Sequence, residues 1–212
     1  IEFRLSDQWF VRMGPMAEKA LAASGYTKTD EEWTRKEDSS ELRLHPPRHE
    51  KVYFHWLSNI RDWCISRQIW WGHRIPAWVH VETGECIVSV NTPEQIKDQP
   101  DSWRQEDDVL DTWFSSALWP FATLGWPKKT EELAYFHTTD LMITGRDILY
   151  LWVLRMIMTA TEFVDEIPFK TVLVHPTVMT RDGRRMSKSL GTGLNPLELV
   201  EMYGADATRY GL

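Results

Sequence analysis

The sequence predicts an α/β fold, with a parallel sheet and a mixed helical and β insert. Two short apolar strands, residues 138–144 and 171–174, are separated by a turn at Gly145 and a helix that runs to about Thr161. This strand–helix–strand order is typical of a βαβ unit, which has parallel strands and a right-handed crossover. Because the helix is apolar nearly all round, we expect it to be buried between layers.

Length and composition are ordinary for a globular protein. The chain has 212 residues, of which 42% are hydrophobic and 26% are charged. Its net charge of −7 excludes a generally basic nucleic-acid coat, so any contact with RNA must be local. Two cysteines without a CxxC motif exclude a disulfide-dense scaffold. Neither a secretory signal nor a membrane-spanning stretch is evident, so we expect a cytoplasmic protein with no membrane partner.

The first part of the chain is predicted to be mainly helical. Residues 15–23 begin with proline, are rich in alanine and end before a glycine, as a helix does. Residues 27–40 are charged and weakly patterned, which predicts a surface connection. Residues 42–47 read as extended and are stopped by two prolines. Residues 50–62 carry apolar side chains at helical spacing and predict an amphipathic helix.

An aromatic block follows at residues 63–76, with the sequence WCISRQIWWGHRIP. Twelve tryptophans in one chain are unusual and suggest large apolar pockets or interfaces in addition to a core. Taken alone, this block is also compatible with a core strand or helix that ends among packed tryptophans.

Residues 77–107 predict a short β-hairpin that turns near Thr83 and Gly84, followed by a polar excursion. Cys86 lies in this region with His80 and His73 nearby in the sequence. A single cysteine without a partner is a weak metal signal, so we predict a hairpin without zinc and no metal site.

A second block, DDVLDTWFSSALWP, spans residues 107–120. Its clustered acids are compatible with the start of a helix, with Asp111 or Thr112 as the N-cap. Further along, Asp147 falls in the first turn of the buried helix, where a carboxylate also complements the helix dipole.

A basic loop, RRMSKSLG at residues 184–191, follows the second strand and the turn-rich segment TRDG. Ligands of open α/β sheets bind beyond the carboxyl ends of the strands, and cations with hydroxyls suit phosphate. A solvated basic turn or an Arg-Arg-x-Ser kinase site remains an alternative. After the loop, residues 196–203 predict a helix capped by Asn195 and closed by Gly204, and a further helix begins beyond it.

The string RMSKS at residues 185–189 resembles the KMSKS signature of class I aminoacyl-tRNA synthetases, with Arg185 in place of the first lysine. The blocks at residues 63–76 and 107–120 resemble corresponding blocks of the valine-specific enzymes of this class. The isoleucine-specific enzymes differ there. The resemblance covers essentially the whole chain and implies the second half of a Rossmann-like parallel sheet.

The resemblance implies roles for the residues of the basic loop. Lys188 would stabilise charge that moves onto pyrophosphate when a carboxylate attacks the α-phosphate of ATP. Arg185, Ser187 and Ser189 belong to the same catalytic signature.

Other residues would bind the nucleotide and the amino acid. Gly145 and Asp147 match the Gly-x-Asp motif of the family, with Asp147 as acceptor for a ribose hydroxyl. Asp108 would lie near the adenylate. Trp71 and Trp113 would form two walls of the amino-acid pocket.

His175 is also assigned to the nucleotide site. The family more often has His-Gly where this chain has His175-Pro176, and the adenine contact depends on whether the glycine amide is used.

The implied function is part of a valine–tRNA ligase that uses ATP and Mg²⁺ to form valyl-adenylate and then charges tRNA(Val). An isoleucyl-type synthetase, or a stand-alone non-catalytic binding module derived from one, is the alternative. The HIGH signature of the family is not found in the sequence, so we expect a piece of a longer enzyme that is inactive by itself.

The resemblance also suggests four segments. Residues 1–62 would be a helical connective segment after an editing domain, and residues 63–130 an insert with the tryptophan blocks. Residues 131–195 would be the second Rossmann half with the KMSKS loop. Residues 196–212 would begin a helical region that contacts the tRNA stem.

Overall fold

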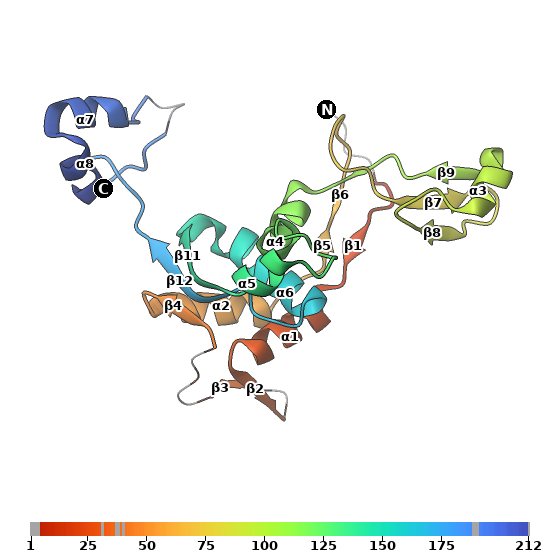
Figure 1. Ribbon diagram of the computed structural model, residues 1–212, viewed down its shortest axis with the longest axis horizontal. Coiled ribbons are helices and arrows are strands. Elements are labelled where there is room, and N and C mark those ends of the chain that lie inside the picture. Colours follow the sequence, from red (N-terminus) through yellow and green to blue (C-terminus); the bar gives the residue numbers. More distant parts are fainter. Residues whose placement is uncertain (1–4, 31, 37–38, 40, 188–190, 212) are drawn as a thin grey trace.

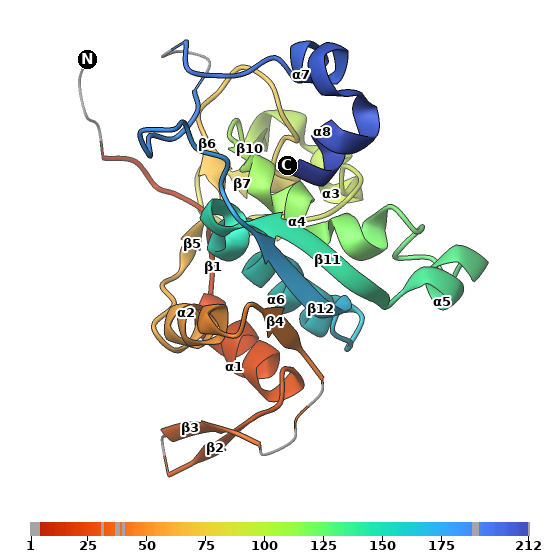
Figure 2. The ribbon, with the colours of Figure 1, turned by 90° about the vertical axis from the view of Figure 1, so that its left-hand side faces the viewer.

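The centre of the fold is a three-stranded parallel sheet with the strand order β11–β12–β4. A computed structural model describes residues 5–30, 32–36, 39, 41–187 and 191–211. The strands are β4 (Arg43–His45), β11 (Thr139–Gly145) and β12 (Phe169–His175). Figure 2 shows β11 and β12 side by side across the middle of the molecule. The predicted βαβ unit is confirmed, and the extended segment at 42–47 supplies a third parallel strand.

The two faces of this sheet differ. On β12, Val172 and Val174 point toward the helices and are buried. On β11, Leu141 and Ile143 point the other way and are 51% and 55% exposed. One face is therefore covered, and the other is open.

The crossover from β11 to β12 is irregular at its start. A 3₁₀ turn (η2, Arg146–Ile148) and a π-helical turn (η3, Leu149–Val153) precede the α-helix α6 (Leu154–Phe163). The predicted helix is confirmed, but the expectation of complete burial is wrong for its first turns, because Tyr150 is 37% exposed and stacks on Trp56. Residues 156–161 of α6 are all buried, whereas Phe163 at the end of the helix is 44% exposed.

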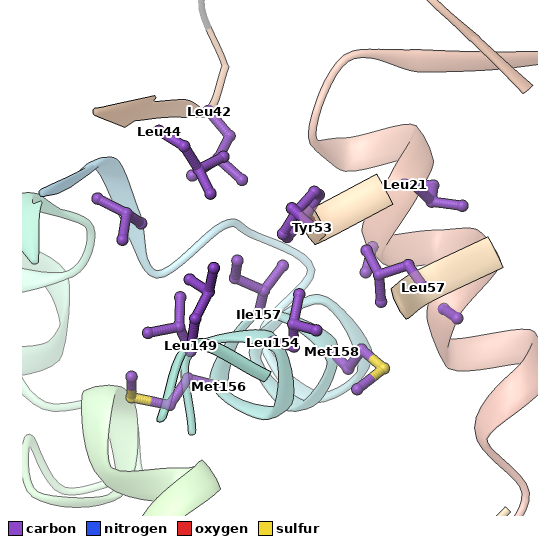
Figure 3. Packing of buried hydrophobic residues seen from close by; sticks show 14 of the residues in the cluster. Leu21, Leu42, Leu44, Tyr53, Leu57, Leu149, Leu154, Met156, Ile157 and Met158 are labelled. Carbon is purple, nitrogen blue, oxygen red and sulfur yellow. The ribbon is translucent and has the colours of Figure 1, made fainter. Parts of the chain in front are cut away.

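The core lies where α6 meets two helices from the beginning of the chain. These are α1 (Met13–Ala23) and α2 (Arg48–Ser58), and they confirm the helices predicted at 15–23 and 50–62. Figure 3 shows Leu21, Tyr53 and Leu57 next to the α6 residues of the cluster. Tyr53 is wholly buried, and its hydroxyl lies 2.5 Å from Ser24 Oγ.

The charged segment predicted as a surface connection at 27–40 contains two strands that the sequence analysis did not predict. The strands β2 (Tyr26–Thr29) and β3 (Glu32–Arg35) form an antiparallel hairpin. Tertiary contacts hold this polar ribbon, since Tyr26 stacks on Phe54 of α2 and Arg35 pairs with Glu50 at 2.5 Å. The sequence of the ribbon alone contains no strong strand pattern.

The predicted hairpin near residue 83 is confirmed as β7 (Ala77–His80) and β8 (Cys86–Val88). A third strand, β9 (Trp103–Gln105), pairs with the other edge of β7, preceded by a short helix α3 (Glu94–Asp98) and a 3₁₀ turn (Pro100–Ser102). Figure 1 shows that this small sheet projects from one end of the molecule.

Short antiparallel pairs connect that sheet to the core. They are β1 (Phe10–Val11) with β5 (Trp63–Cys64), and β6 (Ser66–Arg67) with β10 (Val109–Leu110). Helix α4 (Thr112–Ala122) follows β10 and packs on α6. Helix α5 (Glu131–Phe136) then leads into β11.

Two helices end the chain, α7 (Pro196–Tyr203) and α8 (Ala205–Gly211), at the end of the molecule opposite to the small sheet (Figure 1). The predicted cap is confirmed, because Asn195 accepts a hydrogen bond from the backbone of Leu197. Among the described residues, no helix combines the length and the apolar character needed to cross a bilayer.

Candidate nucleotide and amino-acid site

A cavity of about 470 Å³ opens at the carboxyl end of β12, between this strand and α2. This is the edge at which open α/β sheets bind ligands. Among the predicted site residues, His175 lines the cavity. The complete lining is Arg48, His49, Val52, Arg146, Val174, His175, Pro176, Thr177 and Met179.

Two predicted residues from different elements meet next to this cavity. Asp147, in the 3₁₀ turn after β11, forms an ion pair with Arg185 of the basic loop, with 2.8 Å between Oδ2 and Nη1. Both side chains are largely exposed, at 57% and 72%. An exposed pair of this kind contributes at most about 1 kcal/mol, so a ligand can displace it. The Asp147 carboxylate is thus directed toward the basic loop.

A tight turn precedes the basic loop. Thr180 and Arg184 exchange backbone and side-chain hydrogen bonds, and Gly183 takes a left-handed conformation with φ of +79°. The bonds from Thr180 and Arg184 lower the pKa of the exposed Asp182. Ser187 donates its backbone N–H to Thr192 Oγ1 at 2.9 Å. Lys188 and Ser189, two predicted catalytic residues, lie outside the described residues.

Gly145 and His175 are register partners at the ends of the two parallel strands. The His175 ring donates from Nδ1 to the carbonyl of Pro176 at 2.8 Å. A Cβ added to Gly145 would lie 3.5 Å from His175 Nε2, an ordinary contact. Gly145 has φ of −80°, so neither its conformation nor its protein neighbours require glycine. Close approach of a ligand remains the predicted reason.

The two aromatic blocks, which are separate in the sequence, lie against each other. Leu110 donates to the carbonyl of His73 at 2.7 Å, and Ile75 donates to that of Asp108 at 3.0 Å. Gly72 has φ of +145°, and a Cβ there would lie 2.9 Å from a methyl group of Val109. Glycine is therefore needed at this crossing. The chain places the segment with Trp71 directly beside the segment that leads to Trp113.

The two predicted pocket walls have different surroundings. Trp71 is 79% exposed, whereas Trp113 is partly buried and packs against the main core. Asp108 accepts a hydrogen bond from Gln68 at 2.7 Å. Within the described part of the chain, no ring contact joins Trp71 to Trp113, and no polar contact joins Asp108 to Asp147. The amino-acid pocket and the adenylate contact of Asp108 remain predictions.

Asp111 has a role that the sequence analysis missed. It occupies the N-cap position of α4, but its side chain makes no capping hydrogen bond. Its carboxylate is buried, accepts from Trp63 Nε1 at 2.9 Å and pairs with Arg67 at 3.1 Å. Arg155 of α6 lies 3.9 Å from the same oxygen and stacks 3.8 Å above the Trp63 ring. Burial lowers the pKa of Arg155, and the Asp111 carboxylate opposes this effect.

Arg155 is the residue from which this cluster could have been predicted in the sequence. An arginine inside an otherwise apolar helix must find an acidic partner when it is buried. The Asp111 cluster (Trp63, Arg67, Asp111 and Arg155) joins both aromatic blocks to α6.

No group of three or more His, Cys, Asp or Glu side chains that could hold a metal ion occurs among residues 5–30, 32–36, 39, 41–187 and 191–211. Cys86 is exposed, and His80 accepts hydrogen bonds from two turn amides of the hairpin.

Comparison with known proteins gives a family match over residues 2–212, to the tRNA synthetases class I (I, L, M and V). The chain is 51% identical to the valine–tRNA ligase of Bacillus subtilis (strain 168) and 52% identical to that of Geobacillus kaustophilus (strain HTA426). All of the chain is matched in both comparisons, and it spans 22% of the length of these relatives.

Solved structures share the fold. Mycobacterium tuberculosis methionyl-tRNA synthetase bound by methionyl-adenylate matches 97% of the chain and 32% of its own length, with a TM-score of 0.66 and 21% identity. The LeuRS of Agrobacterium radiobacter K84, in a ternary complex with tRNA and LeuAMS, matches 76% of the chain and 27% of its own, with a TM-score of 0.54 and 20% identity.

Proposed function

The chain belongs to the class I tRNA synthetases of the isoleucine, leucine, methionine and valine group, and from this premise we propose that it is part of a valine–tRNA ligase. The valine carboxylate attacks the α-phosphate of ATP, a new O–P bond forms, and the bond to pyrophosphate breaks. The valyl group of valyl-adenylate then passes to a hydroxyl of tRNA(Val), and AMP is released. The cytoplasm, where protein synthesis consumes the valyl-tRNA product, is the proposed location.

The crossing of the two aromatic blocks is the observation that supports valine most directly. Gly72 rests on Val109, and the backbone bonds of His73 and Asp108 hold the two segments in register. Trp71 and Trp113 extend from these segments, so rigid indole faces from both can bound one small aliphatic side chain. The branched side chain of valine offers only size and shape for recognition, which suits such walls.

Charge at the nucleotide end comes from the residues around the sheet edge. Asp147 accepts a ribose hydroxyl, and this requires Arg185 to release the carboxylate that it now holds at 2.8 Å. Gly145 and His175 bound the nucleotide at the strand ends. Lys188, with Ser187 and Ser189, stabilises the charge that develops on pyrophosphate. Mg²⁺ enters with the ATP phosphates, which supply most of its oxygen ligands in such sites.

The decisive experiment grafts this chain into a relative of known length. Residues 1–212 replace the matched segment of the Bacillus subtilis enzyme, and valine-dependent ATP–pyrophosphate exchange is measured. We expect the graft to be active and the chain alone to be inactive, because it corresponds to only 22% of the relative's length. A graft that folds, by its circular dichroism, but shows no exchange with valine contradicts the proposal.

Variants of the graft separate binding from chemistry. Lys188→Ala should lower kcat for exchange roughly 10²–10³-fold, as for loss of one charge-stabilising donor. An effect on KM alone argues against a transition-state role. Trp71→Phe or Trp113→Phe should relax the rejection of isoleucine while valine is still activated. If both variants keep the wild-type preference for valine over isoleucine, neither tryptophan lines the pocket.

A further inference from the structure

Two arginines line the cavity at the end of β12, and the proposed function gives neither of them a role. Arg48, at the start of α2, and Arg146, directly after β11, face it from two sides. Among the residues that the structure describes, no acidic side chain lines this cavity, although the chain as a whole carries a net charge of −7. Two guanidinium groups around an acid-free cavity form a local anion-attracting field.

The nearest carboxylates in sequence are engaged elsewhere. Glu50, two residues after Arg48, pairs with Arg35 of the β2–β3 hairpin at 2.5 Å. Asp147, next to Arg146, pairs with Arg185 at 2.8 Å. Within the described residues, neither Arg48 nor Arg146 has an ion pair or a side-chain hydrogen bond. Their guanidinium donors are available to a ligand.

His49 adds a buried polar group to the same cavity. His49 is only 5% exposed, and its ring makes no hydrogen bond within the described part of the chain. Burial lowers the pKa of His49, and the charges of Arg48 and Arg146 lower it further. The ring is therefore neutral near pH 7 and keeps one N–H donor and one acceptor nitrogen.

The first backbone amides of α2 are not available as donors to a ligand in this cavity. The first amides of α2 already donate, His49 N to the carbonyl of Pro46 and Glu50 N to that of Pro47. Hydrogen-bond donors for a ligand in this cavity must therefore come from its side chains. We propose that Arg48, His49 and Arg146 form a phosphate-binding site that takes an anionic phosphate ester through two guanidinium groups and one imidazole.

Phosphate fits these donors better than a carboxylate does. Two guanidinium forks from different elements offer more N–H donors than the two oxygens of a carboxylate can accept well, whereas a phosphate presents oxygens in several directions. The site adjoins Gly145 and His175, so the nucleotide phosphates and the backbone of an RNA end are the two sources within reach. The choice between these sources rests on the proposed function, but the existence of the site does not.

The test is direct binding of pyrophosphate to the 212-residue chain, measured by titration calorimetry at low salt. Arg48→Gln and Arg146→Gln should each weaken binding about tenfold, as expected when a charged hydrogen-bond partner is lost. Arg209→Gln in α8 is the matched control, since it removes the same charge from an exposed residue that does not line the cavity. It should change the dissociation constant less than twofold.

Histidine spectra locate the ligand. In ¹H–¹⁵N spectra of the imidazole groups, pyrophosphate should move the signals of His49 and leave those of the buried His137 in place. His49→Gln identifies the signals and should itself weaken binding. Displacement of pyrophosphate by ATP or by tRNA then identifies the source of the phosphate, and either result supports the proposed site.

Three results would overturn the proposal. They are no pyrophosphate binding by the folded wild-type chain, equal weakening by Arg209→Gln, or unchanged His49 signals at saturation. Each is independent of the exchange assay on the graft, because pyrophosphate binding to the chain requires neither valine activation nor the rest of a ligase. Failure of valine exchange with intact pyrophosphate binding would reject the proposed function and leave the site.

Discussion

Replacing Asp111 by asparagine should destabilise the chain through charge rather than through shape. Asparagine keeps an oxygen that can accept from Trp63 Nε1, the bond that measures 2.9 Å. It removes the negative charge beside Arg67 and Arg155, whose side chains are 38% and 17% exposed. Arg155 already has one nitrogen, Nη1, that is buried without a hydrogen bond within the described residues.

The magnitude follows from this burial. Removing one partner of a fully buried ion pair costs about 3–5 kcal/mol. Arg67 is more than one-third exposed and regains water, and Arg155 keeps its stacking on Trp63, so we expect about 2–4 kcal/mol here. With a urea m-value of about 2 kcal/mol per molar, the midpoint should fall by about 1–2 M.

Urea denaturation followed by far-ultraviolet circular dichroism measures this change without relying on the nearby tryptophan. Asp107→Asn is the matched control, because Asp107 pairs with Arg74 at 2.8 Å but is 74% exposed. That variant should cost less than about 1 kcal/mol. If Asp111→Asn costs no more than Asp107→Asn at an unchanged m-value, the cluster does not stabilise the crossing of the two blocks and the reasoning is wrong.

Three other outcomes are expected. Tyr53→Phe should lower the free energy of unfolding by about 0.5–1.5 kcal/mol in urea denaturation, since Ser24 keeps its 2.7 Å bond to the carbonyl of Ala20; a loss above 3 kcal/mol would mean that the ring packing has changed. Gly145→Ala should leave the melting temperature within about 2 °C, because the protein leaves room for the methyl group. The same substitution should weaken ATP binding in the graft, because the methyl group would lie where the nucleotide approaches the backbone. Burial lowers the pKa of His137, opposed by Glu166, so stability should fall as pH drops below about 6.5, where only the unfolded histidine takes up a proton readily; His137→Gln should flatten that urea-midpoint profile.

The local sequence pattern was sufficient to predict the elements whose spacing and capping residues lie within their own segment. The apolar strands, the Gly145 turn and the capped helix after Asn195 could be predicted because spacing and capping determine them within a few residues. The turn at Gly84 was found for the same reason. These elements also place Gly145, Asp147 and His175 at one edge of the sheet.

Long-range contacts decided what the sequence did not reveal. The hairpin of β2 and β3 depends on Phe54 and Glu50 of α2, which lie outside its own segment. Asp111 looked like a cap, but Arg67 and Arg155 draw its side chain away from the helix amides. Arg48 and His49 gave no sign of a site, because only the fold brings them beside Arg146.

The order of strands in the sheet has a consequence for synthesis on the ribosome. β12 is the middle strand, yet it is made last, and β4 and β11 do not pair with each other within the described residues. Until Phe169–His175 leaves the exit tunnel, both earlier strands lack their common partner. The sheet therefore closes in a single late step across distant parts of the chain, which is slow because long loops must close first. Nascent chains that stop before β12 should be sensitive to protease, and those that extend through α8 should be resistant.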